Sequence, residues 1–162
     1  MKKKLLMLVA AMLFAVSANA QFEKDKLYVG GSLTGLNLSY SGSTDLNLGL
    51  QAHAGYMIED DMMVLANVEL QHNNRSGSHD SFVAGVGGRY YIEQNGIYLG
   101  ANCKFIHANK NYNDIMPGVE VGYAFFLSRT VTVEPAIYYD QSFKNHKDYS
   151  TIGLKIGVGI YL

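Results

Sequence analysis

The sequence is short of cysteine, of long hydrophobic runs and of excess charge. Cys103 is the only cysteine in 162 residues, so no disulfide can form within the chain. The 13 Lys and Arg nearly balance the 14 Asp and Glu, which argues against nucleic acid as a partner. The apolar run at residues 5–16 is too short to cross a membrane as a helix, and no later stretch has the required length.

The first 20 residues have the pattern of a secretory signal peptide. Three lysines precede the apolar run, and Ala18-Asn19-Ala20 has the small-x-small form of a signal-peptidase site. No cysteine lies near this site, so a lipoprotein anchor is not expected. We therefore predict that residues 1–20 are cleaved and that residues 21–162 form a single, mildly acidic domain.

Apolar residues recur at every second position in most of the remaining sequence. In the final segment, TIGLKIGVGIYL, all six even-numbered positions are apolar, and mainly Gly, Thr and Lys lie between them. A period of two predicts a strand with one apolar face. The segments with this pattern lie near residues 25–40, 46–58, 64–71, 81–92, 97–105, 118–125, 131–139 and 151–162. They predict eight strands that are joined alternately by short turns and longer polar loops.

Two of these segments are irregular. The apolar positions change parity between Leu33 and Leu36, which predicts a bulge or break near Gly35. Pro135 falls within the segment 131–139, where it removes a ladder hydrogen bond, and a bulge would accommodate it.

The composition of the two faces distinguishes two eight-stranded architectures. A soluble lipocalin-like barrel points apolar side chains inward and covers its outside with charge, whereas a membrane barrel does the reverse. Here the second face is mostly Gly, Ser, Thr, Asn and Gln, which suits the crowded interior of a narrow barrel. An open sheet edge in lipid would leave backbone groups unpaired, so such a barrel must close. We predict an all-β, eight-stranded antiparallel up-and-down transmembrane β-barrel.

Six charged residues interrupt the predicted inward face. They are Glu69, Arg89, Lys104, Glu120, Glu134 and Lys155. Each two strands joined by a long loop carry one acid and one base, which predicts the pairs Glu69 with Arg89, Lys104 with Glu120, and Glu134 with Lys155. If the last loop is centred between Lys144 and Asn145, Lys155 lies directly opposite Glu134. Because an unpaired enclosed charge is costly, we expect these pairs to have a structural role and to favour one strand register.

Three tyrosines mark one end of the predicted barrel. Tyr56, Tyr90 and Tyr123 each stand shortly before a short turn, at spacings of 34 and 33 residues. Such tyrosines would end successive strands at one interface, where a membrane barrel has its aromatic girdle.

The signal-type start, the eight alternating segments, the short turns against longer loops and the terminal KIGVGIYL resemble the small outer-membrane β-barrel proteins of the OmpA/OmpX type. Chains of this type usually end in an aromatic residue, and the present sequence departs from this because Leu162 is its last residue. The resemblance implies the outer membrane of a Gram-negative bacterium, contact with its lipids and use of the barrel-insertion machinery. It also implies short periplasmic turns and longer extracellular loops.

Several functions are compatible with this fold. Side chains fill an eight-stranded barrel, so we expect no open pore. The leading interpretation is a non-enzymatic barrel with a structural or adhesion-type role, whose outer loops meet an unknown surface ligand. The first alternative is a lipid A-modifying enzyme with candidates His72, His79, Asp80 and Ser81, although adjacent strand residues face opposite ways and would not form a triad. The second alternative is a soluble lipocalin-like periplasmic carrier.

No metal, cofactor or catalytic site is predicted. The five histidines have no tight ligand spacing; they are His53, His72, His79, His107 and His146. We expect His53 to lie inside the barrel as a hydrogen-bonding filler and the other four to lie at or near loops.

Overall fold

The computed structural model describes residues 22–39, 44–45, 48–72, 81–92, 95–108, 112–143 and 150–162. The predicted signal peptide, residues 1–20, lies outside these ranges. Across them, no helix is long and apolar enough to cross a membrane.

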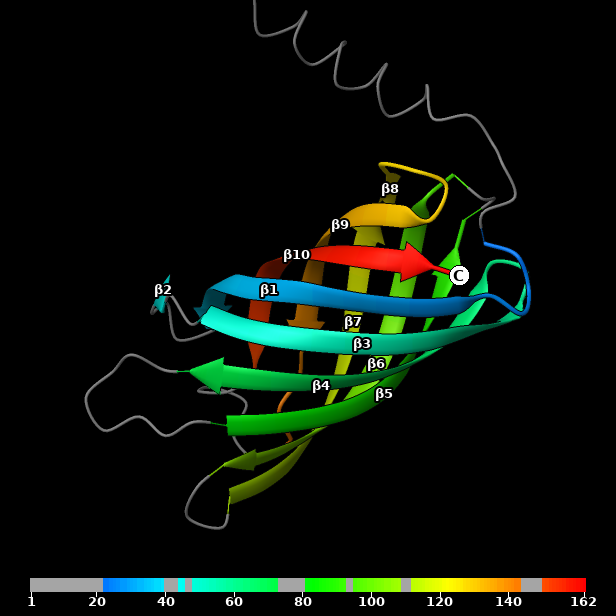
Figure 1. The fold of residues 1–162 in the computed structure, drawn as a ribbon. Helices are drawn as coiled ribbons and strands as arrows, with labels where there is room; N and C mark the ends of the chain where they lie inside the picture. The colour runs from blue at the N-terminus through cyan, green and yellow to red at the C-terminus, as the bar shows by residue number, and fades with distance from the viewer. Residues whose placement is uncertain are drawn as a thin grey trace, which may run out of the picture.

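In the described residues, eight long strands form the wall of a closed antiparallel barrel (Figure 1). They are β1 (Leu27–Ser39), β3 (Leu48–Glu59), β4 (Met62–His72), β5 (Ser81–Tyr91), β6 (Ile97–Ala108), β7 (Tyr112–Tyr123), β9 (Val131–Asp140) and β10 (Thr151–Tyr161). Two short strands, β2 (Thr44–Asp45) and β8 (Phe125–Phe126), pair with β1 and β9. Strand β10 pairs with both β9 and β1, and this closes the barrel. The predicted fold class is confirmed.

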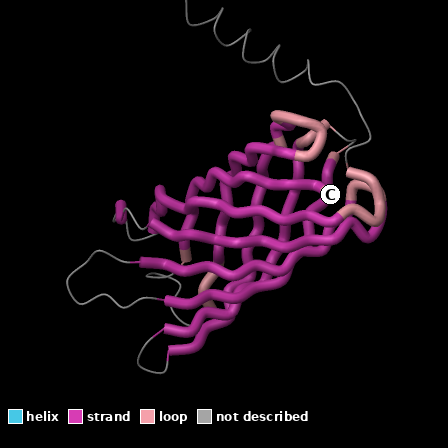
Figure 2. Tube along the Cα trace, viewed as in Figure 1, coloured by secondary structure: helices cyan, strands magenta, loops and turns pink. Residues whose placement is uncertain are grey.

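Short connections lie at the end of the barrel where the chain terminates (Figure 2). Residues 60–61 join β3 to β4, residues 92–96 join β5 to β6, and residues 127–130 join β8 to β9. Gly96 in the second connection has φ +90°, and a Cβ there would lie 2.8 Å from the Ala124 carbonyl oxygen, so this turn requires glycine. The opposite end carries three longer connections, residues 40–47, 73–80 and 141–150, most of whose residues lie outside the described ranges, and one short connection, residues 109–111.

The irregularity predicted near Gly35 is a register shift in β1. Residues up to Thr34 and from Leu36 onward pair with β10 in two different registers. Gly35 is therefore the extra residue of a bulge, as the change of parity predicts.

The bulge predicted at Pro135 is absent, and that prediction was wrong. Strand β9 keeps a single register with β10 and also with the consecutive strands β7 and β8. Instead, β7 ends at Tyr123, opposite Pro135, and β8 resumes at Phe125. Proline has no N–H to donate, so the ladder is interrupted there without an inserted residue.

The two faces of the wall are oriented as in a membrane barrel. Val86 and Ile156 point outward and are 63% and 62% exposed, whereas Arg89 and Lys155 point inward and are 4% and 7% exposed. The soluble lipocalin-like alternative requires the opposite orientation and was wrong. Tyr56 and Tyr90 are exposed on the outer face near the short-turn end, where the aromatic girdle was predicted.

Small residues on the inner face make room for larger neighbours. A Cβ at Gly100 would collide with the Glu120 side chain, and one at Gly122 would collide with the Tyr98 ring. The inward glycines therefore admit ionic and aromatic side chains from adjacent strands into a narrow interior.

Candidate functional site

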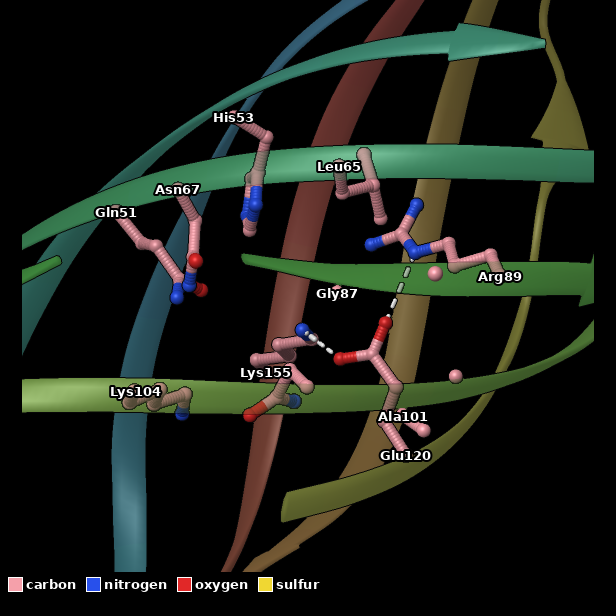
Figure 3. Close-up of a pocket in the computed structure, with 13 residues that line it drawn as sticks. Gln51, His53, Leu65, Asn67, Gly87, Arg89, Ala101, Lys104, Glu120 and Lys155 are labelled. Carbon is pink, nitrogen blue, oxygen red and sulfur yellow. Dashed lines mark hydrogen bonds and ion pairs between the residues drawn. The ribbon is translucent and has the colours of Figure 1, made fainter. Parts of the chain in front are cut away.

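Charged side chains of the described residues lie together in the barrel interior (Figure 3). All six charged residues that the alternation places on the inward face are buried, and each comes from a different strand. Successive side chains of a strand point alternately into and out of the barrel. Six charges therefore come together when each of β4, β5, β6, β7, β9 and β10 has one of them at an inward position.

A central network joins four of these residues across the barrel. Arg89 donates from Nε to Glu120 Oε1 at 2.9 Å and from Nη1 to Glu134 Oε2 at 2.8 Å. Lys155 Nζ donates to the second carboxylate oxygen of Glu120. Figure 3 shows Arg89 and Lys155 meeting the two different carboxylate oxygens of Glu120. Arg89 thus holds two carboxylates and Glu120 holds two cations, an arrangement that compensates their buried charges.

The pairing within hairpins that the sequence predicts was wrong. Strand β10 places Lys155 opposite Ala136 and Glu134 opposite Gly157, so the predicted register is off by two residues. Glu134 binds Arg89, and Lys155 binds Glu120. The physical reason is the narrow interior, in which long inward side chains reach across the barrel axis to strands that are not adjacent.

A second ion pair joins Lys104 and Asp140 nearer the long-loop end. Lys104 Nζ donates to Asp140 Oδ2 at 2.5 Å and lies 5.3 Å from the centroid of the Tyr138 ring. The predicted partner of Lys104 was Glu120, so this assignment was also wrong. Asp140 was assigned to a loop, although it shares the parity of Glu134 and Tyr138 and continues the inward face of β9 by one more step.

Asp114 is a further interior acid that the sequence analysis missed. Ser142 Oγ donates to Asp114 Oδ2 at 2.5 Å, and both residues are buried. Strand β7 begins at Tyr112, six residues before the predicted start at residue 118. The signal was present, because Asp114 has the same parity as Gly118 and Glu120, but the polar letters around it are typical of a loop.

Two neutral polar side chains donate hydrogen bonds to Glu69. Thr34 Oγ1 and Gln51 Nε2 each donate to this carboxylate at 3.4 Å. Ser32 Oγ lies 3.1 Å from Nε2 of His53, which is buried as predicted. Glu69 was predicted to pair with Arg89, whose guanidinium instead binds Glu120 and Glu134.

Five aromatic residues close the interior at the short-turn end; we call them the aromatic cluster. They are Phe22, Tyr28, Tyr91, Tyr98 and Tyr161. Phe22 precedes β1, is 1% exposed and stacks on Tyr91 with ring centroids 3.9 Å apart. Its carbonyl oxygen accepts a hydrogen bond from the Asp61 amide at 2.8 Å. The segment before the first strand is therefore held in the mouth of the barrel.

The aromatic cluster is bonded to the central network through Glu134. The hydroxyl of Tyr28 donates to Glu134 Oε2 at 2.8 Å, and that of Tyr161 donates to Oε1 at 3.2 Å. Thr132 Oγ1 also donates to Oε1, at 2.7 Å. The guanidinium carbon of Arg89 lies 4.3 Å from the centroid of the Tyr98 ring. Both carboxylate oxygens of Glu134 therefore accept hydrogen bonds, as a buried carboxylate requires.

Outside the wall, an exposed ion pair marks the rim at the short-turn end. Lys24 Nζ donates to Glu59 Oε1 at 2.9 Å. This hydrogen bond and the negative charge of Glu59 raise the pKa of Lys24 above its ordinary value. Both side chains are largely exposed, so the pair contributes little to stability.

The space left between the two ionic groups is small. A cavity of about 20 Å³ is lined by residues that include Gln51, His53, Asn102, Arg89 and Lys104. It has room for about one water molecule. Within the described ranges, no three His, Cys, Asp or Glu side chains are grouped so that they could hold a metal ion.

Two of the four residues considered for an enzyme, His72 and Ser81, lie at the long-loop end. Strand β4 ends at His72 and β5 begins at Ser81, and the backbone of Gln71 is opposite Ser81. His79 and Asp80 fall outside the described residues.

Comparison with known proteins identifies the family of this barrel. The model of the outer membrane protein beta-barrel domain matches residues 6–162. The chain belongs to this outer-membrane β-barrel family. No curated protein sequence gives a significant match.

Solved outer-membrane barrels share the fold at low sequence identity. Neisserial surface protein A is 16% identical with a TM-score of 0.62, over 83% of this chain and 96% of its own. The amino-terminal barrel of Pseudomonas aeruginosa OprF is 10% identical with a TM-score of 0.62, over 86% and 98%. Ail of Yersinia pestis, in complex with the heparin analogue sucrose octasulfate, is 13% identical with a TM-score of 0.51, over 86% and 99%.

Membership of the outer-membrane β-barrel family gives the barrel its surroundings. The protein is located in the outer membrane of a Gram-negative bacterium. Its apolar outer wall faces lipid, its short turns lie on the periplasmic side, and its longer loops lie on the extracellular side. The barrel interior is then the only polar environment available to Arg89, Glu120 and Lys155 within the membrane.

Proposed function

We propose that this barrel is a non-enzymatic outer-membrane protein with a filled interior and no open pore, and that its extracellular loops bind a surface ligand. The filled interior would serve as a rigid support for those loops. This proposal separates a structural task, carried by the interior, from an interaction task, carried by the loops.

The single observation that carries the proposal is the continuous set of interior contacts. Side chains from five strands meet in the two ionic groups, the aromatic cluster covers the periplasmic end, and the cavity between the two ionic groups is about 20 Å³. A hydrated ion passing through would have to break the bonds of Arg89 to Glu120 and Glu134, which are buried and charge-assisted.

Two observations support an interaction at the outer surface. Three of the four extracellular connections, residues 40–47, 73–80 and 141–150, are longer than the periplasmic ones, whereas residues 109–111 form a short connection between β6 and β7. Binding residues are concentrated on loops that a rigid scaffold positions. Ail, which has this fold, is known in complex with a heparin analogue, and this makes sulfated glycans a first class of ligand to test.

The interaction is tested with cells that display the protein. A variant in which a Gly-Ser linker of equal length replaces residues 73–80 should lose binding to surfaces coated with heparin or extracellular-matrix protein. A matched variant with the periplasmic turn 127–130 replaced in the same way should bind as the wild type does. Equal binding by all three, or by cells that lack the protein, would contradict the surface role.

The absence of a pore and of lipid chemistry is tested separately. Purified barrel in planar lipid bilayers should give no stable conductance steps, and reproducible steps from the wild type would contradict the filled interior.

Lipid A from cells with and without the gene should have the same acyl pattern by mass spectrometry. A changed pattern would instead favour the lipid A-modifying alternative and direct attention to His72, His79, Asp80 and Ser81.

A further inference from the structure

The outer wall has an open apolar groove that the filled interior does not explain. It crosses β1, β10 and β9 at mid-barrel and has a volume of about 1130 Å³. Its principal lining residues are Gly31, Leu33, Pro135, Ile137, Leu154 and Ile156. We call this feature the outer groove.

Local sequence explains why the wall is hollow at this place. Gly31 faces outward between Val29 and Leu33 and has no side chain to fill its position. Pro135, two strands away, carries only a compact ring and pairs with Ile156. Leu33 and Ile156 project outward beside these positions and form the sides of the groove.

The groove carries no charge that a ligand would have to match. Lys155 contributes to the lining, but its Nζ points into the barrel and binds Glu120. The surrounding outer surface is the aliphatic belt that already contacts the bilayer, so the groove is continuous with an established lipid interface. From mid-barrel it extends to Ile97 and Tyr123, the first residue of β6 and the last of β7, at the periplasmic end.

We propose that the outer groove is a binding site for an acyl chain of a phospholipid in the periplasmic leaflet. A flexible chain can follow a groove that runs from the periplasmic interface to mid-barrel, and burying its methylene groups against Leu33, Ile137 and Ile156 gains packing contacts. A second copy of the barrel would present a rigid wall that curves outward, which follows the floor of the groove less closely.

Gly31 allows the groove to be filled without disturbing the wall. A Cβ built at this position meets only the Gln51 carbonyl oxygen, at 3.6 Å, an ordinary contact. Gly31→Phe would therefore place a ring in the groove. Ala66→Phe is the matched control, because Ala66 faces outward on β4 at a position that does not line the groove. Val121→Phe, on the groove wall, is a second filling variant that leaves Gly31 intact.

The test uses the barrel of residues 21–162, reconstituted in dioleoylphosphatidylcholine vesicles, extracted into a mild detergent and washed extensively. Native mass spectrometry then counts phosphatidylcholine molecules and protein copies in each particle. The wild type and Ala66→Phe should retain about one lipid per barrel. Gly31→Phe and Val121→Phe should retain about tenfold less, which corresponds to a loss of about 1.4 kcal/mol of binding free energy.

Three results would overturn the proposal. They are a wild type that retains no lipid, equal retention by the filling variants and Ala66→Phe, and a wild-type dimer without lipid that Gly31→Phe converts to monomer. The last result would assign the groove to a second copy. Heat-modifiable gel mobility of each variant before extraction shows that the compared barrels are folded.

Discussion

Lys155 and Ile156 are neighbours on β10, yet they meet opposite requirements. Lys155 points inward, is 7% exposed and binds Glu120, whereas Ile156 points outward, is 62% exposed and faces lipid. In a water-soluble barrel the two positions would exchange their chemistry. The inner and outer walls thus show that the solvent outside, and not the strand itself, decides which side of a barrel carries charge.

The two walls also differ in how specific their contacts must be. Over most of the outer wall, lipid chains adapt to whichever aliphatic side chains they meet. On the inner wall each buried charge has to find partners within the protein, and Arg89, Glu120 and Glu134 do so through bonds of defined geometry. Substitutions should therefore have their largest effects on the inner wall.

The largest expected effect is that of Arg89→Met. It removes a cation that binds both Glu120 and Glu134, and it leaves two buried carboxylates with fewer partners. Removing one partner of a buried ion pair costs about 3–5 kcal/mol. We expect a loss of this size in the free energy of unfolding, measured by urea titration in lipid vesicles with gel mobility as the readout.

Arg129→Met is the control for this prediction, because Arg129 is exposed in the turn 127–130. It should change the free energy of unfolding by less than about 0.5 kcal/mol. Adding Glu134→Gln to Arg89→Met should restore part of the lost stability. A loss for Arg89→Met no larger than that for Arg129→Met would show that the interior network does not stabilise the barrel.

The second effect is that of placing a charge on the outer wall. Ile156→Lys puts an ammonium group at mid-barrel, where a cation facing lipid costs about 2–4 kcal/mol. The same residue type is accepted at the adjacent inward position, so the substitution isolates the effect of the surroundings. Leu162→Lys, at the periplasmic end of the chain, should cost at most about 1 kcal/mol. Equal costs at the two sites in the same urea titration would argue against a bilayer around β10.

The third effect concerns the aromatic cluster. Phe22→Ala removes a ring that is stacked on Tyr91 and packed against Tyr161. Deleting a buried Phe side chain usually costs about 3–5 kcal/mol, but the chain before β1 can relax, so we expect about 2 kcal/mol. Phe143→Ala, at a position that is 72% exposed, is the matched control. Hydrogen exchange at the Asp61 amide should also accelerate in Phe22→Ala, because this amide donates to the Phe22 carbonyl.

Much of the fold could be predicted from the sequence because the alternation of apolar and polar residues along a strand shows which residues face outward and which face inward. The parity change at Gly35 predicts the bulge in β1, and the inward position of His53 follows from its place between apolar residues. These features depend on local periodicity alone. The first residues of β7 and Asp140 at the end of β9 follow the same alternation. They were assigned to loops because the residues around them are polar.

The contacts inside the barrel could not be predicted in the same way. Which strands face each other across the axis depends on how the barrel closes, and a single strand's pattern does not contain that information. Arg89 reaches Glu134 on a strand far along the chain, and Phe22 reaches Tyr91 from a segment with no alternation at all. Pairing of charges within each hairpin was therefore a reasonable hypothesis. It was wrong because long side chains in the narrow interior reach strands that are not adjacent.

The smallest expected effect is a difference between two coupling energies. Double-mutant cycles with Lys155→Met should give a coupling of about 1–2 kcal/mol with Glu120→Gln, because Lys155 Nζ donates to Glu120. The coupling with Glu134→Gln should be about 0.5 kcal/mol or less, since Glu134 is reached only through Arg89 and Glu120. The reverse order of coupling energies would restore the pairing of Lys155 with Glu134 that the sequence predicts. It would also show that the strands β9 and β10 pair in the membrane with a register two residues away from the one described here.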